Sequence, residues 1–235
     1  MVATDGHDAV VALLLSDPRV DPAANNNEAI QLASYNGHHK VVSLLLADPR
    51  INPAINHNFP IQAAASNGHD KVVALLLANT RVDPTGHNNL ALRVAAENGH
   101  DVVIALLLGD ARINSADDFN YALRLAASHG WSKVVSLLLR DVRVNPTASD
   151  NAAIRRAARN GYDEVVAILL ADARSDPAAA NNYALRLSAR KGHTKVVSLL
   201  LADSRVDPSA NDYEALQMAT AHGYGDVVEL LENWC

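Results

Sequence analysis

The chain has 235 residues, of which 49% are apolar and 4% aromatic, and its formal net charge is −6 at pH 7. This apolar share allows a continuous aliphatic core, and the negative charge argues against non-specific nucleic-acid binding, which needs a basic surface. The only cysteine, Cys235, excludes an internal disulfide, and the sequence shows neither a signal-peptide pattern nor an apolar run long enough for a bilayer, so we expect a cytoplasmic or nuclear protein outside membranes.

One ten-residue block recurs along the chain at a constant interval of 31 residues. Its opening glycine stands at Gly6, Gly37, Gly68, Gly99, Gly130, Gly161, Gly192 and Gly223. In the copy Gly68–Leu77, valines and leucines cover most of the circumference of a short helix, which predicts burial on nearly all sides. A second, alanine-rich block, as at Ala91–Ala96, predicts a helix that packs closely against the first. Each repeat is therefore predicted to be two antiparallel helices joined at a left-handed glycine.

In chain order, we expect half a repeat over residues 1–23 and then seven repeats of 31 residues. The last repeat carries Glu229 and Glu232 in its second helix and is predicted to be a C-terminal cap. One repeat buries too little apolar surface to fold alone, so residues 1–235 are predicted to form a single stacked array.

The segments between the helix pairs combine proline with asparagine. Dipeptides such as Asp83-Pro84 stop a helix, because proline lacks an amide proton and restricts its predecessor. The asparagines that follow are interpreted as N-caps that accept a hydrogen bond from an unpaired amide of the next helix. They are Asn27, Asn58, Asn89, Asn120, Asn151 and Asn182.

The two blocks resemble the two helices of the ankyrin repeat. Gly68–Leu77 matches the family's Gly-His-x-x-Val-Val-x-Leu-Leu-Leu, and Leu125–Gly130 matches its Leu-Ala-Ala-x-x-Gly. The resemblance implies an all-α, right-handed solenoid of stacked helix-turn-helix repeats with short hairpin or loop connections. The period is shorter than the family's period of about 33, Tyr121–Arg124 replaces Thr-Pro-Leu-His, and Asp-x-Arg replaces the glycine after the second helix. A shorter finger between the helix pairs is therefore expected.

Two residue types recur once per repeat and are interpreted as structural. Histidine follows the turn glycine at His7, His38, His69, His100 and His193. One ligand per repeat cannot converge on a metal ion, so neither a metal nor another cofactor is expected. Arginine recurs at Arg19, Arg50, Arg81, Arg112, Arg143, Arg174 and Arg205. Because an acidic residue precedes all but Arg81 by two positions, we favour local ion pairs between loops over an anion-binding column.

The resemblance implies that a partner contacts the first helices and hairpin tips, so residues that break the period there are candidate contacts. An apolar and aromatic strip comprises Phe59, Leu90, Phe119, Tyr121 and Tyr183, with Tyr35, His57, His87 and Asp118 at related positions. A basic patch comprises Arg155, Arg156 and Arg159 in one repeat and Arg186, Arg190 and Lys191 in the next, and Arg93 and Arg124 extend the row. Two alternatives stay open: the strip packs between adjacent hairpins, and the patch pairs with Asp163 and Glu164.

No catalytic motif is present, and an enzyme is not expected. The favoured function is a monomeric, non-enzymatic module that binds another protein through an acidic or apolar segment of that partner. One alternative is a structural scaffold or an engineered repeat protein without a natural ligand. A less favoured alternative is an anion or nucleic-acid binder that acts through the recurring arginines.

Overall fold

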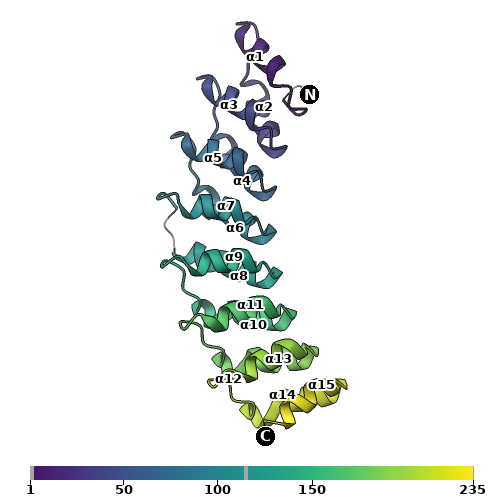
Figure 1. The fold of residues 1–235 in the computed structure, drawn as a ribbon. Helices are drawn as coiled ribbons and strands as arrows, with labels where there is room; N and C mark the ends of the chain where they lie inside the picture. Colours follow the sequence, from purple (N-terminus) through teal and green to yellow (C-terminus); the bar gives the residue numbers. More distant parts are fainter. Residues whose placement is uncertain (1–2, 114–115, 235) are drawn as a thin grey trace. The chain divides into compact units, whose positions relative to one another are not determined.

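The computed structural model describes residues 3–113 and 116–234, and these residues form fifteen helices and no strand (Figure 1). In chain order the helices are α1 (Asp8–Ser16), α2 (Ala24–Tyr35), α3 (His39–Ala47), α4 (Ile55–Ser66), α5 (Asp70–Ala78), α6 (Gly86–Asn98), α7 (Asp101–Leu108), α8 (Ala116–His129), α9 (Ser132–Leu139), α10 (Ala148–Asn160), α11 (Asp163–Ala171), α12 (Ala179–Lys191), α13 (Thr194–Leu201), α14 (Ala210–His222) and α15 (Gly225–Glu232). Even-numbered helices contain the alanine-rich block and odd-numbered helices the valine-leucine block. The predicted all-α repeat of helix pairs is confirmed.

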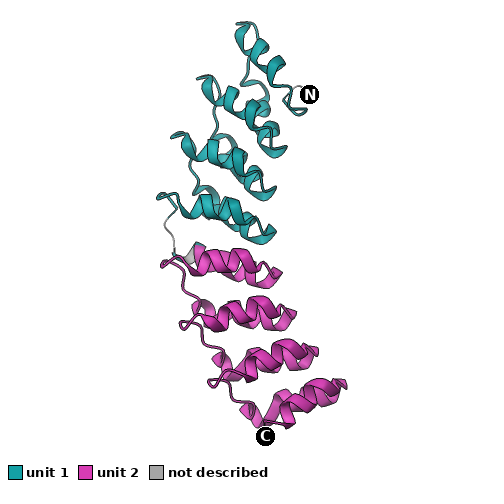
Figure 2. Ribbon diagram, in the orientation of Figure 1, with its two compact units in different colours: residues 1–118 teal, residues 119–235 magenta. Residues whose placement is uncertain are grey.

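The helices belong to two compact units, Met1–Asp118 and Phe119–Cys235, called unit 1 and unit 2 (Figure 2). In unit 1, the first helices α2, α4 and α6 pack side by side, and the second helices α1, α3, α5 and α7 form another row. In unit 2, α10, α12 and α14 form one row, and α9, α11, α13 and α15 the other. Each unit therefore has two helical layers, as expected for stacked repeats. A single array over residues 1–235 stays a prediction.

The interior of each unit repeats the same few side chains. In α5, Val72, Val73 and Leu76 are fully buried, whereas the leucines on either side of Leu76 are half-buried. In α4, Ala64 and Ala65 are fully buried, and their small side chains let helix axes approach closely. Burial against neighbouring repeats supplies the stability that an isolated helix pair lacks.

The first helix of each pair ends at the predicted left-handed glycine. Gly37 has φ 77°, and the amide of His38 donates to the carbonyl of Ala33 at 2.9 Å, which closes the six-residue Schellman turn. The ring of His69, one repeat later, donates from Nε2 to the carbonyl of Tyr35 at 2.9 Å. The structural interpretation of the recurring histidines is therefore confirmed where these bonds form, at His38, His69, His100 and His193.

Each described connection contains a single left-handed helical turn that the sequence analysis did not predict. Before the right-handed part of α4, the residues Asn56, His57 and Asn58 have φ values of 50°, 58° and 68°. This conformation costs about 1–2 kcal/mol for most residues and least for Asn and Asp. Of the eighteen non-glycine residues with positive φ in the described ranges, eleven are Asn and two are Asp. The left-handed turn explains why these segments are rich in asparagine.

The last asparagine of the turn binds the next repeat, so its interpretation as an N-cap is wrong. Oδ1 of Asn58 accepts from the amide of Asp83 at 2.8 Å, and Oδ1 of Asn27 accepts from the amide of Asn52 at 2.7 Å. The same bond is made by Asn120, Asn151 and Asn182. Because the residue lies inside a left-handed turn, its side chain reaches the following loop instead of the first amides of its own helix.

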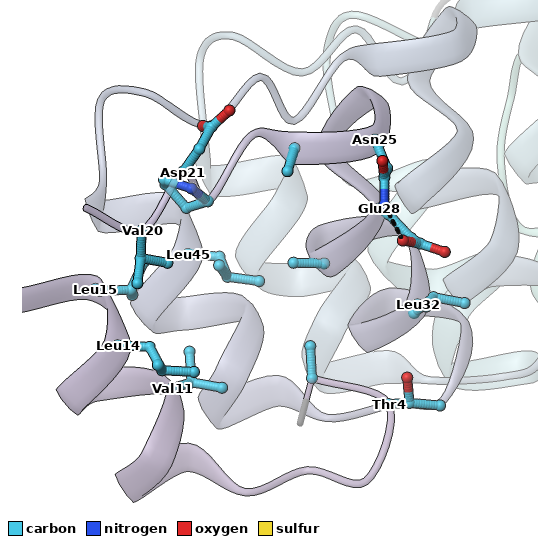
Figure 3. A pocket seen from close by; sticks show the side chains of 14 residues that line it. Thr4, Val11, Leu14, Leu15, Val20, Asp21, Asn25, Glu28, Leu32 and Leu45 are labelled. Carbon is cyan, nitrogen blue, oxygen red and sulfur yellow. Dashed lines mark hydrogen bonds between the residues drawn. The ribbon is translucent and has the colours of Figure 1, made fainter. Parts of the chain in front are cut away.

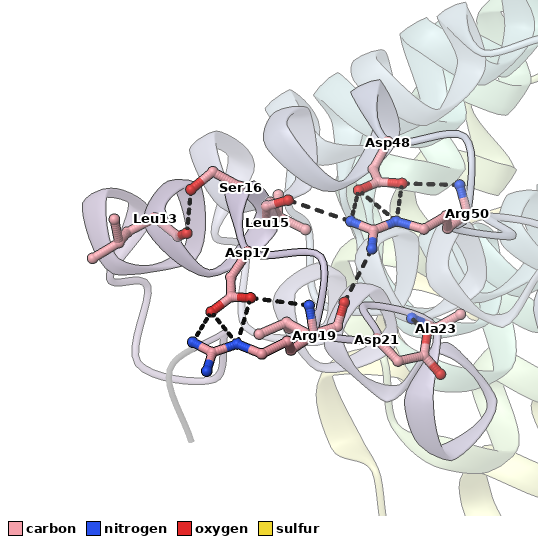
Figure 4. Close-up of polar contacts among 10 residues, drawn as sticks. Leu13, Leu15, Ser16, Asp17, Arg19, Asp21, Ala23, Asp48 and Arg50 are labelled. Carbon is pink, nitrogen blue, oxygen red and sulfur yellow. Dashed lines mark hydrogen bonds and ion pairs between the residues drawn. The ribbon is translucent and has the colours of Figure 1, made fainter.

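The recurring arginines form what we call the arginine clasp, an Asp-x-Arg pair that holds the preceding repeat (Figure 4). Two nitrogens of Arg50 bind the carboxylate of Asp48, at 3.0 Å from Nε and 2.6 Å from Nη2. Nη1 also donates to the carbonyl of Val20 at 3.0 Å, and Nη2 to that of Leu15 at 3.3 Å. Leu15 lies in the last turn of α1, where carbonyls lack helical partners and a cation is favourable. The predicted local ion pair is confirmed, and hydrogen bonds from the same guanidinium to backbone carbonyls tie its loop to the preceding repeat.

Candidate functional site

In unit 1, the predicted contact residues lie on the turns and first helices. Tyr35 and Phe59 are 53% and 37% exposed, and Leu90 is half-buried. His57 and His87, from adjacent turns, are exposed and stack with their ring centroids 4.6 Å apart. These side chains are accessible to a partner, but they do not line a common cavity with opposed polar groups.

Asp118 and Phe119 have contacts within the protein that the sequence analysis did not anticipate. The carboxylate of Asp118 accepts from Nδ2 of Asn89 at 2.6 Å. Phe119 is 0% exposed, and the guanidinium carbon of Arg143 lies 4.3 Å from its ring centroid. The prediction that Phe119 contacts a partner is therefore wrong, because its ring is already covered. The alternative that the strip packs inside the repeats applies to this residue.

In unit 2, Tyr121 and Tyr183 are half-buried, and each has an arginine of its own helix beside its ring. The guanidinium carbon of Arg124 lies 5.2 Å from the ring centroid of Tyr121. These distances fit cation–π contacts, which fix the ring while leaving part of it open to solvent.

The predicted basic patch surrounds a groove between α10 and α12. The groove has a volume of about 470 Å³. Its lining residues are Ser149, Ala152, Arg155, Arg156, Arg159, Tyr183, Leu187, Arg190 and Lys191, and we call it the basic groove. Arg155, Arg156 and Arg159 come from α10 at a spacing that places them within two turns, and Arg190 and Lys191 end α12. Sequence reasoning did not identify Leu187 as part of this site, since a leucine in a repeat helix predicts core.

Tyr183 forms one wall of the basic groove and fixes the position of Arg155. The guanidinium carbon of Arg155 lies 5.5 Å from the ring centroid of Tyr183, and its Nη2 donates to the carbonyl of Ser149 at 2.9 Å. Arg186, one repeat later, lies 5.2 Å from the same centroid, and its Nε is 2.9 Å from the carboxylate of Glu214. Arg186 is thus neutralised by Glu214 and does not line the groove.

The positive charge of the basic groove is not balanced by neighbouring carboxylates. Within the parts of the chain that the structure describes, none of its five cations forms an ion pair. Asp163, which the sequence analysis considered as a partner, lies 3.9 Å from Nζ of Lys195 on α13. Arg156, Arg159, Arg190 and Lys191 are all exposed. The groove therefore presents four exposed cations and one half-buried cation that is held in place.

The cations of the basic groove all come from one pair of adjacent first helices. At the two registers that carry Arg156 and Arg159 in α10, α8 has a leucine and a serine, and α14 has a methionine and an alanine. The groove is thus a local concentration of positive charge in a chain whose net charge is −6. Such a concentration of one sign of charge raises the local concentration of anions.

A further cavity of about 230 Å³ lies in unit 1 beside α1 and α2 (Figure 3). Its lining is mainly aliphatic and includes Val11, Leu14 and Leu45, and Nδ2 of Asn25 donates to the carboxylate of Glu28 at 3.0 Å. None of the predicted contact residues lines this cavity. Its lining is mainly that of incomplete apolar packing, and its polar groups Asn25 and Glu28 are hydrogen-bonded to each other.

The described residues contain neither a metal site nor a membrane-spanning helix. No group of three or more His, Cys, Asp or Glu side chains there is arranged to hold a metal ion. No helix among them combines the length and the apolar character needed to cross a membrane.

Comparisons with known proteins bear on this architecture of short helix pairs. A family model described as ankyrin repeats (3 copies) matches residues 1–88, 30–117, 92–181 and 156–233. The chain belongs to the ankyrin-repeat family. A similar solved structure is the crystal structure of an ankyrin repeat domain from Acinetobacter baumannii AYE, with 23% identity and a TM-score of 0.56, covering 73% of this chain and 95% of that one. The search of curated proteins found no match.

Ankyrin repeats are general protein–protein interaction modules and are typically non-enzymatic. This ankyrin-repeat chain carries its period of 31 residues with a left-handed turn before the first helix. Gln or Arg stands where the family has histidine, and Nε2 of Gln62 donates to the carbonyl of His57 in that turn at 2.7 Å. Arg155 makes a similar bond to the carbonyl of Ser149, one position earlier in its turn, so the shortened ankyrin repeat and the groove use a related positioning contact.

Proposed function

We propose that this ankyrin-repeat protein is a non-enzymatic module that binds another protein through the first-helix face of unit 2. The contact is the basic groove, and the partner contributes a negatively charged segment. The observation that carries the proposal is the group of five cations with no acidic partner in the described chain. Unpaired cations of this kind steer an acidic partner and form charge-assisted hydrogen bonds with it.

The lining of the basic groove supports binding more than catalysis. It contains four arginines, a lysine, a tyrosine and a serine, but no histidine, cysteine or carboxylate. The lining thus lacks histidine and carboxylate, the commonest bases that activate a serine or tyrosine nucleophile. Guanidinium groups with aromatic and aliphatic neighbours are instead typical of contact surfaces between proteins.

An affinity purification with a charge-reversed groove tests this function. The variant Arg156→Glu/Arg159→Glu/Arg190→Glu changes only exposed side chains and should keep the helical circular dichroism spectrum of the wild type. We expect recovery of the partner to fall by about tenfold or more, because several charge-assisted bonds are lost together. The matched control is Lys71→Glu/Lys133→Glu/Arg140→Glu, which makes the same change in net charge on exposed residues of the second-helix side. Equal recovery by the two variants contradicts the proposal.

The apolar form of the proposed contact depends on Tyr121 and Tyr183. If the partner instead binds through an apolar segment, the variant Tyr121→Ala/Tyr183→Ala should recover less of the partner, and the charge-reversed variant should recover as much as wild type. We expect the reverse order, because both rings are half-buried beside arginines and offer less free surface than the exposed guanidinium groups.

A further inference from the structure

We propose that the basic groove recognises a phosphorylated side chain, so that the partner binds after phosphorylation of a serine, threonine or tyrosine. This inference rests on the proposed function and names the anion that the groove selects. It is carried by the compactness of the cation cluster, by its donor chemistry and by a comparison between two equivalent arginines.

The cluster lies around a single groove. All five cations line this groove of about 470 Å³, and the registers of Arg156 and Arg159 are uncharged in α8 and α14, although α8 has Arg124, beside Tyr121, at the register of Arg155. An extended acidic segment places successive carboxylates of one face about 7 Å apart and would need cations on several repeats. A phosphorylated side chain brings a charge of about −2 and three acceptor oxygens to one point.

The donors in the groove are mostly guanidinium groups. Arg155, Arg156, Arg159 and Arg190 each present a planar fork of N–H donors, and Lys191 adds a point charge. Such forks bind two oxygens of a phosphate at once, which a set of lysines does not do. Arg155 is pre-oriented by the carbonyl of Ser149 and the ring of Tyr183, which lowers the entropic cost of ordering one of the forks.

Arg155 and Arg186 occupy the same register in consecutive repeats but differ at Nε. Nε of Arg186 lies 2.9 Å from the carboxylate of Glu214, which belongs to the following repeat. At the register of Glu214, the repeat after Arg155 has Tyr183, and Nε of Arg155 is shielded from solvent without a hydrogen-bond acceptor in the described chain. Neither Nε makes a hydrogen bond, but a carboxylate lies beside Nε of Arg186 and none lies beside that of Arg155, although both arginines are held by turn carbonyls and the same tyrosine ring. Arg155 therefore keeps a positive charge that no carboxylate of the described chain compensates, and an oxyanion from a partner would compensate it.

Three fluorescent peptide pools with identical random flanks test this inference. Their central position is serine, phosphoserine or a pair of glutamates, and binding is measured by anisotropy at one ionic strength. We expect the phosphoserine pool to bind about tenfold or more tightly than either other pool, because a dianion forms several charge-assisted bonds at once. The variant Arg159→Gln/Arg190→Gln should abolish this preference, and the control Lys133→Gln/Arg140→Gln should keep it.

A second measurement separates this inference from the proposed function. Treating the lysate with a phosphatase before affinity purification should remove the partner from the wild-type eluate. If the glutamate pool binds as tightly as the phosphoserine pool, or recovery survives phosphatase and is still lost on charge reversal, the phosphate inference is wrong and an acidic segment is the ligand. If charge reversal also leaves recovery unchanged, the proposed function fails as well. Stronger competition by single-stranded DNA or by phosphoinositide vesicles than by phosphoserine peptide overturns the inference in favour of those polyanions.

Discussion

At the scale of single residues, the turn glycines meet two requirements that no other side chain meets. Gly68 has φ 73°, and a Cβ placed on it would lie 2.6 Å from Nδ1 of His100. The ring of His100 is there because its Nε2 donates to the carbonyl of Ser66 at 2.9 Å. Gly223 has a similar φ of 74° but no atom within 4 Å of the position of a Cβ. A comparison of Gly68 with Gly223 therefore separates the cost of backbone strain from the cost of disturbing the contact between repeats.

Replacement of these glycines by alanine is the first prediction. Both Gly68→Ala and Gly223→Ala should lower the free energy of unfolding by about 1–2 kcal/mol through left-handed strain. Gly68→Ala should cost about 1 kcal/mol more, because the histidine must move and its hydrogen bond is lost. Urea denaturation followed by circular dichroism measures both changes. Equal losses for the two variants would show that the histidine contact contributes nothing to stability.

The arginine clasp makes a residue-scale prediction about pH. The bond from Arg50 lowers the pKa of Asp48 from 3.8 to about 2. Because the pKa is lower in the folded state, the clasp stabilises the protein above pH 3.8, and this contribution is lost as the pH falls through about 2. Asp48→Asn should therefore unfold at a lower urea concentration than wild type at pH 7, and the gap should close near pH 2.

The repeat of Arg81 supplies the matched control for this pH effect. Asn79 stands there in place of aspartate, and Arg81 still donates from Nη1 to the carbonyl of Ile51 at 2.8 Å. Asn79→Asp should raise the urea midpoint at pH 7 and lose that gain in acid. A gain that persists at pH 2 would mean that the added group acts through packing or a neutral hydrogen bond.

At the scale of the structural element, the left-handed turn links one repeat to the next. Asn58 has φ 68°, is buried, and accepts the amide proton of Asp83. In the last repeat, Tyr213 occupies the same register with φ 61° and is 44% exposed. The asparagine thus combines tolerance of the left-handed conformation with a bond that needs a following repeat.

Substitution within this turn is the element-scale prediction. Asn58→Ala should lower the free energy of unfolding by roughly 1 kcal/mol, because the part-buried hydrogen bond from the amide of Asp83 is lost. Tyr213→Ala has the same backbone conformation and no such bond to lose, so it should cost clearly less. Thermal unfolding monitored by circular dichroism makes the comparison. A cost for Tyr213→Ala as large as that for Asn58→Ala would assign the effect to the turn backbone alone.

At the scale of the whole molecule, the distribution of charge matters more than its sum. The chain has 20 Lys and Arg residues against 26 Asp and Glu residues. The arginines of the clasp already bind carboxylates or carbonyls of the protein. The five cations of the basic groove, by contrast, repel one another without compensation in the described chain. This repulsion is a cost to stability that binding of an anion would remove.

The corresponding prediction is that neutralising the groove stabilises the free protein. Arg156→Gln/Arg190→Gln should raise the unfolding free energy at low salt by about 0.2–0.5 kcal/mol for each close pair relieved. Lys133→Gln/Arg140→Gln, away from the groove, should bring no such gain. The difference should vanish at high ionic strength, where salt screens exposed charges. A groove variant less stable than the control at low salt would contradict the proposed repulsion.

The sequence by itself determined the repeat, the two helices of each pair and the glycine at their junction. These features follow from local properties: the apolar period, the helix propensity of alanine and the left-handed freedom of glycine. It also located the cations that meet at the basic groove, because Arg156 interrupts the apolar residues at its register. Periodicity of this kind is visible in one dimension because each repeat contacts only its neighbours.

Only the tertiary structure decided which groups are already occupied. Asn58 looks like a cap in sequence but binds a loop 25 residues later, and Phe119 looks like a contact residue but is covered. Arg155 and Arg186 look equivalent, yet only Arg186 has a carboxylate partner. The physical reason is that hydrogen bonds and ion pairs between repeats depend on which side chains neighbouring layers bring within reach, and the repeat period does not record those distances.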